Sequence, residues 1–138
     1  MNAETVEVMA QQLPSRLHLS PHFTVQEIAC RHCGRVFVVP TLLEMLERLR
    51  EAVGTPLVVN SGYRCPEHNR RIGGAPRSKH CLGMAADINI PKQHRIKTIF
   101  FLEEVTKIVL SVRGGFHYYP AAEFVHIDCW PWPPDRRW

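Results

Sequence analysis

Three short motifs contain the residue types from which a metal site is built. His80 and Asp87 belong to S-x-H-x-x-G-x-A-x-D, His126 and Asp128 form H-x-D, and Arg64 ends S-G-Y-R. Two imidazoles and a carboxylate suit zinc, and three protein ligands leave a fourth position open. Magnesium fits less well, because imidazoles are poor ligands for a hard cation. His80, Asp87 and His126 are therefore candidate ligands of one zinc ion.

The elements that must position these residues are two predicted strands. In AADINI (85–90) and FVHID (124–128), apolar residues alternate with polar ones, so Asp87 and His126 lie on the face opposite the core. Gly83 allows a tight turn before the first strand, and the small Ala85 leaves room beside Asp87. Spacing alone leaves open a packed histidine and a solvated aspartate instead of a metal site.

The remaining elements indicate an α+β domain with a central antiparallel sheet flanked by helices. Thr24 and Glu27 form a capping box for a short helix through Cys30, and apolar residues at helical spacing predict helices over 41–54 and 94–111. LVVNS (57–61) reads as a strand, and GFHYY pairs with EFVHID as a hairpin. The loop 62–83 contains a short helix over 66–71, and its length indicates a function.

Length and composition restrict the class of protein. The 138 residues suffice for one domain, predicted over 23–138 and preceded by a loosely held arm over 1–22. No apolar run is long enough to span a bilayer, and the first twenty residues do not resemble an export signal. The net charge of +4 comes mostly from scattered basic residues. We expect a monomer made in the cytoplasm, without nucleic-acid binding or membrane insertion.

The five cysteines are an odd number, and together with the lack of an export-like signal they favour free thiols over disulfides. Cys30 and Cys33 form the only C-x-x-C, whereas Cys65, Cys81 and Cys129 are isolated. A zinc ribbon needs a second such pair, so buried free thiols are the preferred interpretation. A thiol-based or zinc-ribbon protein built on the C-x-x-C pair remains an alternative.

The longest motif resembles a known family. SGYRCPEHNRRIGGAPRSKHCLGMAADINI followed by FVHID looks like the zinc D-Ala-D-Ala carboxypeptidases and L-alanyl-D-glutamate endopeptidases, which share a fold with the Hedgehog signalling domain. The resemblance runs from about Phe23 to the C-terminus. It implies one zinc ion held by His80, Asp87 and His126, and a peptidoglycan stem peptide as substrate.

The resemblance also implies roles for neighbouring residues. Arg64 matches an arginine that holds a substrate carboxylate or the polarised carbonyl, and Ser78 matches a serine that contacts substrate or orients a loop. Glu123 fits branches with E-x-x-H, whereas Asp128 fits branches with H-x-D. Glu123 is the preferred general base, and Asp128 is either the alternative base or a partner that holds His126 in place.

The function that follows is metal-assisted hydrolysis of a peptide bond in the cell wall. The sequence does not distinguish a D-Ala-D-Ala carboxypeptidase from an L-Ala-D-Glu endopeptidase. The small domain without an export signal suits a phage or prophage lysis enzyme. The alternative is a non-catalytic module of the same fold that retains zinc and binds the cell wall or a protein.

Overall fold

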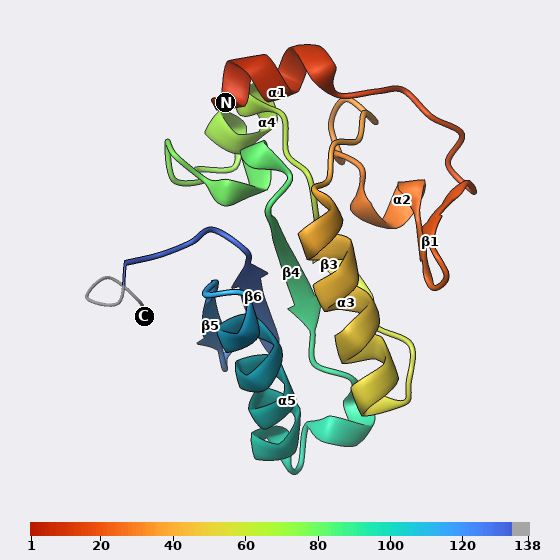
Figure 1. Ribbon diagram of the computed structural model, residues 1–138, viewed down its shortest axis with the longest axis vertical. Coiled ribbons are helices and arrows are strands. Elements are labelled where there is room, and N and C mark those ends of the chain that lie inside the picture. Colours follow the sequence, from red (N-terminus) through yellow and green to blue (C-terminus); the bar gives the residue numbers. More distant parts are fainter. Residues whose placement is uncertain (134–138) are drawn as a thin grey trace.

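The computed structural model describes residues 1–133, and its centre is a four-stranded antiparallel sheet with the strand order β3-β4-β6-β5 (Figure 1). A separate short ribbon pairs β1 with β2. The elements are α1 (Ala3–Met9), β1 (His18–Ser20), β2 (Phe23–Thr24), α2 (Val25–Ile28), α3 (Pro40–Val53), β3 (Val58–Ser61), α4 (Pro66–Arg71), η1 (Lys79–Leu82), β4 (Ala85–Asn89), η2 (Lys92–His94), α5 (Thr98–Ser111), β5 (Gly115–Tyr119) and β6 (Phe124–Asp128). The predicted α+β class is confirmed.

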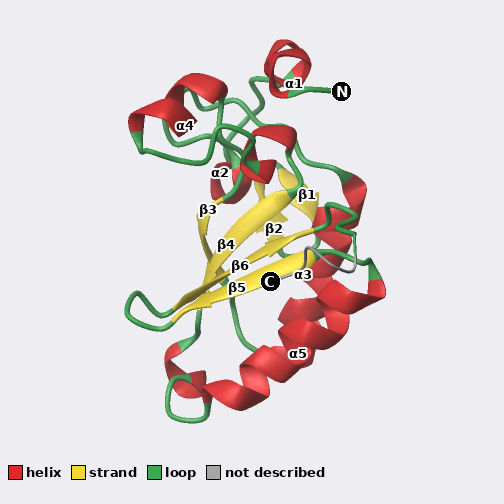
Figure 2. Ribbon diagram, turned by 90° about the vertical axis from the view of Figure 1, so that its left-hand side faces the viewer, coloured by secondary structure: helices red, strands yellow, loops and turns green. Residues whose placement is uncertain are grey.

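Helices α3 and α5 cover one face of the sheet (Figure 2). The apolar residues of the two central strands enter this core; they are Ala86, Ile88, Val125 and Ile127. They pack with the apolar stripes of the two helices, which include Leu42, Leu46, Phe101 and Val105. The polar residues that alternate with them in β4 and β6 therefore project from the other face of the sheet.

Local signals set the ends of several elements. Helix α3 begins with Pro40 in its first turn and ends at Gly54, whose φ of 69° is left-handed. The capping box of α2 is formed, and the Glu27 carboxylate accepts from the Thr24 backbone N–H at 3.1 Å. This helix ends at Ile28, earlier than predicted, because Ala29 is extended.

Helix α5 begins at Thr98, four residues later than predicted. Residues 92–94 form the separate 3-10 turn η2 instead, and Ile96 is 94% exposed, so it does not belong to the apolar stripe. The Arg95 guanidinium donates to the Ile90 carbonyl at 3.1 Å and holds this turn against the end of β4.

The expectation of a loose N-terminal arm is wrong for its first part. Asn2 caps α1 by accepting from the Thr5 backbone N–H at 2.9 Å, and Val6 is completely buried. Gln11 then forms a β-bridge with Val36.

Among the described residues, no helix has the length and apolar character needed to cross a membrane. Positions 134–138 of the predicted domain lie outside the described residues.

Candidate metal centre

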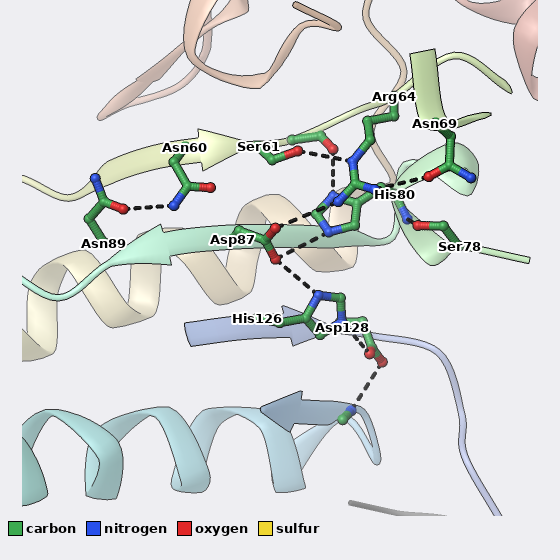
Figure 3. Close-up of polar contacts among 12 residues, drawn as sticks. Asn60, Ser61, Arg64, Asn69, Ser78, His80, Asp87, Asn89, His126 and Asp128 are labelled. Atoms are coloured by element: carbon green, nitrogen blue, oxygen red, sulfur yellow. Dashed lines mark hydrogen bonds and ion pairs between the residues drawn. The ribbon is translucent and has the colours of Figure 1, made fainter. Parts of the chain in front are cut away.

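Asp87 and His126 face each other across the two central strands (Figure 3). They are directly opposite in the antiparallel register of β4 and β6, and Nδ1 of His126 lies 3.0 Å from Oδ1 of Asp87. Because the flanking residues of both strands enter the core, these two side chains share the polar face. The sheet itself thus brings a carboxylate and an imidazole together.

His80 approaches the same carboxylate from η1. Its Nε2 lies 3.2 Å from Oδ1 of Asp87, and its Nδ1 lies 2.8 Å from the Gly62 carbonyl oxygen. A carbonyl only accepts, so Nδ1 carries the proton and Nε2 keeps a lone pair for a metal. Ser78 caps η1 by accepting from the His80 backbone N–H at 3.3 Å, and Gly83 ends it with a left-handed φ of 67°.

The three side chains fit a metal ion in number and chemistry. One ligand atom of each lies within 4.8 Å of the others, and the group is formed by His80, Asp87 and His126. Two neutral imidazoles and one carboxylate suit zinc or a similar transition metal rather than magnesium or calcium. The group could therefore hold one metal ion.

The electrostatics favour an ionised Asp87 and a neutral His80, which are the forms that bind a cation. Burial raises the pKa of Asp87, but the neighbouring imidazoles of His126 and His80 outweigh it and hold the pKa well below its usual range. Burial lowers the pKa of His80, which keeps this imidazole neutral. Burial also acts to lower the pKa of His126, yet its hydrogen bonds to Asp128 and Asp87 raise it overall. The surroundings of His126 thus favour a positive charge, which a metal cation can supply.

Asp128 contacts His126 at the ring nitrogen that faces away from Asp87. Its Oδ2 lies 2.9 Å from Nε2 of His126, so this imidazole is held between two carboxylates, with Nδ1 toward Asp87. A carboxylate that accepts from the far nitrogen of a ligand histidine fixes its orientation and increases its basicity. Asp128 thus has the geometry of a positioning residue.

The structure does not bring Glu123 to the three ligands. This residue lies in the turn between β5 and β6 with a left-handed φ of 53°, and its Oε2 pairs with Nε of Arg95 at 2.7 Å. Its carboxylate is therefore turned toward the loop after β4. The preference for Glu123 over Asp128 is not supported by this placement.

Arg64 enters the site just after β3. Its Nη2 lies 3.6 Å from Oδ2 of Asp87, its Nε donates to Ser61 Oγ at 3.1 Å, and its Nη1 donates to Asn69 Oδ1 at 2.9 Å. Asn69 is buried and donates in turn to the Ala75 carbonyl at 2.8 Å. The motifs predict no role for Asn69, and the available signal was its position five residues after Arg64 within the longest motif.

These residues line a cavity of about 330 Å³ on the polar face of the sheet. Its basic side chains are Arg64, Arg77 and Lys79, and its other lining residues include Ser78, Tyr119, Phe124 and Trp132. Ser78 thus lies at the cavity as well as at the cap of η1. Among the described residues, the acids of this cavity are Asp87 and Asp128.

Two imidazoles and one carboxylate that converge on one point are typical of a catalytic metal site, and sequence comparison identifies the family. The Peptidase M15 family model matches residues 21–128, so the chain belongs to this family of peptidases. This confirms the resemblance inferred from the motifs.

Two kinds of curated relatives are similar to the chain. Peptidoglycan L,D-endopeptidase MepK of Escherichia coli (strain K12) is 37% identical over 107 residues, which are 72% of this chain and 53% of the relative. The MepK of Shigella flexneri gives the same values. Zinc D-Ala-D-Ala carboxypeptidase of Streptomyces albus G is 41% identical over 49 residues, which are 35% of this chain and 19% of the relative. The chain spans about half the length of the MepK proteins.

Proposed function

We propose that this chain is a zinc-dependent peptidase that hydrolyses the stem peptides of peptidoglycan. The observation that carries the proposal is the convergence of His80, Asp87 and His126 at one point of a cavity that also holds Arg64. The names of the two kinds of relatives support it, since one is a peptidoglycan endopeptidase and the other a zinc carboxypeptidase.

Five residues of the cavity have distinct parts in this proposal. Zinc would act there as a Lewis acid that polarises the scissile carbonyl and increases the acidity of a water molecule. His80, Asp87 and His126 would hold it, and Asp128 would keep His126 in its binding orientation. Arg64 would donate to an oxygen of the substrate, where a fixed cation stabilises developing negative charge.

We infer that Asp128, rather than Glu123, is the acid that serves this site. Asp128 lines the cavity and contacts a ligand imidazole, whereas Glu123 is paired with Arg95 at the hairpin turn. A general base must come within hydrogen-bond reach of the proton that it accepts. Glu123 is not among the described residues that line the cavity, and the contact of Asp128 with Nε2 of His126 supports a role in holding this imidazole.

The charge of the cavity fits a peptide that carries free carboxylates. Arg64, Arg77 and Lys79 surround the metal ligands, and a forked guanidinium matches a carboxylate in geometry. The stem peptides of peptidoglycan are acidic and end in a carboxylate. We therefore place Arg64 beside the substrate as well as beside Asp87, with Ser78 as a second polar contact.

The test is digestion of purified peptidoglycan with zinc-loaded protein, with the released fragments identified by mass spectrometry. We expect cleavage within the stem peptide, at an L,D or a D,D bond, and the fragment masses distinguish the two. His126→Ala should abolish cleavage and lower metal content, whereas His18→Ala, an exposed histidine of β1, should change neither. Binding to the cell wall without cleavage would instead favour the non-catalytic module.

A further inference from the structure

A second group of metal-binding side chains lies outside the cavity. The Sγ atoms of Cys30, Cys33 and Cys65 all lie within 4.8 Å of one another. Cys30 and Cys65 are buried and Cys33 is partly buried, and all three are free thiols. Cys65 lies 35 residues from Cys30 along the chain, so the sequence alone does not show that the two are close.

The backbone explains how Cys65 reaches the pair. Gly62 passes so close to α2 that a Cβ at this position would lie 2.4 Å from the Ile28 carbonyl oxygen. The next residue, Tyr63, donates its backbone N–H to the same oxygen at 2.7 Å. Cys65 therefore stands beside the end of α2, where Cys30 begins a tight turn that Gly34 completes with a φ of 73°.

His32 lies in the same turn and is a candidate for the fourth ligand, although the group whose ligand atoms all lie within 4.8 Å of one another consists of the three cysteines. Its Nδ1 lies 3.7 Å from the Sγ of Cys65. In a tetrahedral zinc site with Zn–S of about 2.3 Å and Zn–N of about 2.0–2.1 Å, a sulfur and a nitrogen ligand lie about 3.6 Å apart. The observed separation is thus close to that between two ligands of one ion. The His32 ring also stacks on His68, with an interplanar angle of 7°.

The surroundings provide hydrogen-bond donors for thiolates. The Cys65 backbone N–H donates to the Sγ of Cys30, and the His68 backbone N–H donates to the Sγ of Cys65, both at 3.4 Å. Tyr63 belongs to the same buried cluster, and its buried hydroxyl has no hydrogen-bond partner within residues 1–133. Donors around the ligand sulfurs are the usual outer contacts of a metal site.

We propose that Cys30, Cys33, Cys65 and His32 bind a structural zinc ion, separate from the His80–Asp87–His126 centre. A closed set of three thiolates and one imidazole is typical of structural zinc.

The second ion would join two parts of the chain that the catalytic site requires. Cys30 and Cys33 follow α2, whereas Cys65 comes directly after Arg64 and before α4. A metal at this point would fix the segment that carries Arg64 to the end of α2. Because such a site does not exist in the unfolded chain, its binding free energy would also stabilise the fold.

The experiment measures zinc content and the absorption of the cobalt-substituted protein, purified with a reductant. We expect about two zinc ions per chain, and a thiolate-to-cobalt charge-transfer band that a His-Asp-His site cannot give. The double variant His80→Ala, His126→Ala should retain one ion and the band. This result would stand even if the proposed peptidase function failed.

Cysteine variants then locate the ion. Cys65→Ala should lose one zinc ion and the charge-transfer band, whereas Cys129→Ala, a buried cysteine of the main core, should keep both. The wild-type cobalt spectrum does not depend on whether Cys65→Ala folds. Absence of the band from the wild-type protein, or a disulfide between any two of the three cysteines in the reduced preparation, would overturn the proposal.

Histidine variants test the fourth ligand. His32→Ala should weaken zinc binding at the cysteine site, measured by chelator competition on the His80→Ala, His126→Ala background. His68→Ala removes only a stacked ring and should leave that affinity within about threefold. If His68→Ala alone weakened binding, the assignment of His32 would be wrong.

Discussion

Oδ2 of the completely buried Asp128 lies 2.9 Å from Nε2 of His126. Its Oδ1 accepts from the backbone N–H groups of Gly115 and Trp130 at 3.1 and 3.2 Å, and from the Trp132 indole at 2.9 Å. When His126 binds a metal through Nδ1, its proton lies on Nε2, so all four of these partners donate to Asp128. The pocket around Asp128 therefore requires an ionised carboxylate.

Asp128→Asn should weaken both metal binding and the fold. The side-chain NH2 of the new asparagine would face an N–H donor in place of a carboxylate oxygen. Two donors cannot form a hydrogen bond with each other, so the substitution should cost about 1–3 kcal/mol of unfolding free energy. Loss of the support for His126 should lower zinc affinity by about 10- to 100-fold. Chelator competition and thermal unfolding measure the two effects, and unchanged zinc affinity would contradict the positioning role.

Glu123→Gln makes the same carboxylate-to-amide change as Asp128→Asn, at the second candidate for the general base. Because Glu123 contacts Arg95 at the hairpin turn, we expect hydrolysis to stay within about threefold of wild type. Steady-state assays on a purified stem peptide measure this. A loss of about 100-fold or more with zinc retained would return the general base to Glu123.

Arg64→Lys keeps the charge and removes the planar fork. Arg64 uses Nε, Nη1 and Nη2 on Ser61, Asn69 and Asp87, which one ammonium group cannot reproduce. We expect kcat/KM to fall by at least about tenfold, with zinc content and melting temperature close to wild type. Arg70→Lys, an exposed arginine on α4, is the control, and equal activity in both variants would count against a role for Arg64.

Gly74→Ala should displace Arg64 while leaving the arginine side chain itself unchanged. A Cβ at this position would lie 2.0 Å from Asn69 Oδ1 and 2.8 Å from Arg64 Nη1. Asn69 is buried and bonded to the Ala75 carbonyl, so it cannot move aside freely. Activity should fall while zinc content remains, and a crystal structure of the variant should show Arg64 displaced.

Glu47→Gln tests the attachment of the β1–β2 ribbon to α3. Glu47 accepts from Ser20 Oγ at 2.6 Å and from the His22 backbone at 2.7 Å, and its other oxygen lies 2.6 Å from His22 Nδ1. Burial raises the pKa of Glu47, but these hydrogen bonds lower it overall, below its ordinary value of 4.5. A carboxyl with a lowered folded-state pKa stabilises the fold above its unfolded pKa and loses that contribution as pH falls through the folded pKa.

Wild type should therefore be more stable than Glu47→Gln at neutral pH, and the difference should shrink as the pH falls below about 4.5. Denaturant unfolding at several pH values measures this difference. Glu44→Gln, an exposed residue on the same helix, should show no such pH dependence. A constant difference from pH 3 to pH 7 would show that ionisation of Glu47 is not involved.

The sequence predicted the parts of this site that depend on strand alternation. The placement of Asp87 and His126 on one face follows from period-two patterning, and the short helix over 66–71 follows from its local composition. The position of Glu123 was not predictable in this way. Glu123 itself adopts a left-handed backbone conformation in the hairpin turn, and this conformation sets the direction of its side chain. The E-x-x-H spacing to His126 does not reveal the conformation of the turn.

The contacts of Cys65 and α1 were missed for a different reason. Both depend on packing between segments distant in sequence, since Val6 enters the small cluster that contains Tyr63 and Cys65. No periodic signal in residues 1–10 indicates a buried face, because only Val6 is completely buried within α1. Tertiary contacts fix these elements, and local propensity does not.

The direct opposition of Asp87 and His126 restricts how the length of this chain can vary. An insertion or deletion of one residue within β4 or β6 would turn Ala86, Ile88, Val125 or Ile127 outward and send the ligands into the core. Such a change would remove the metal site and the apolar core together. Additions should be tolerated better at the exposed β5–β6 turn, so differences in substrate preference among related chains should arise there.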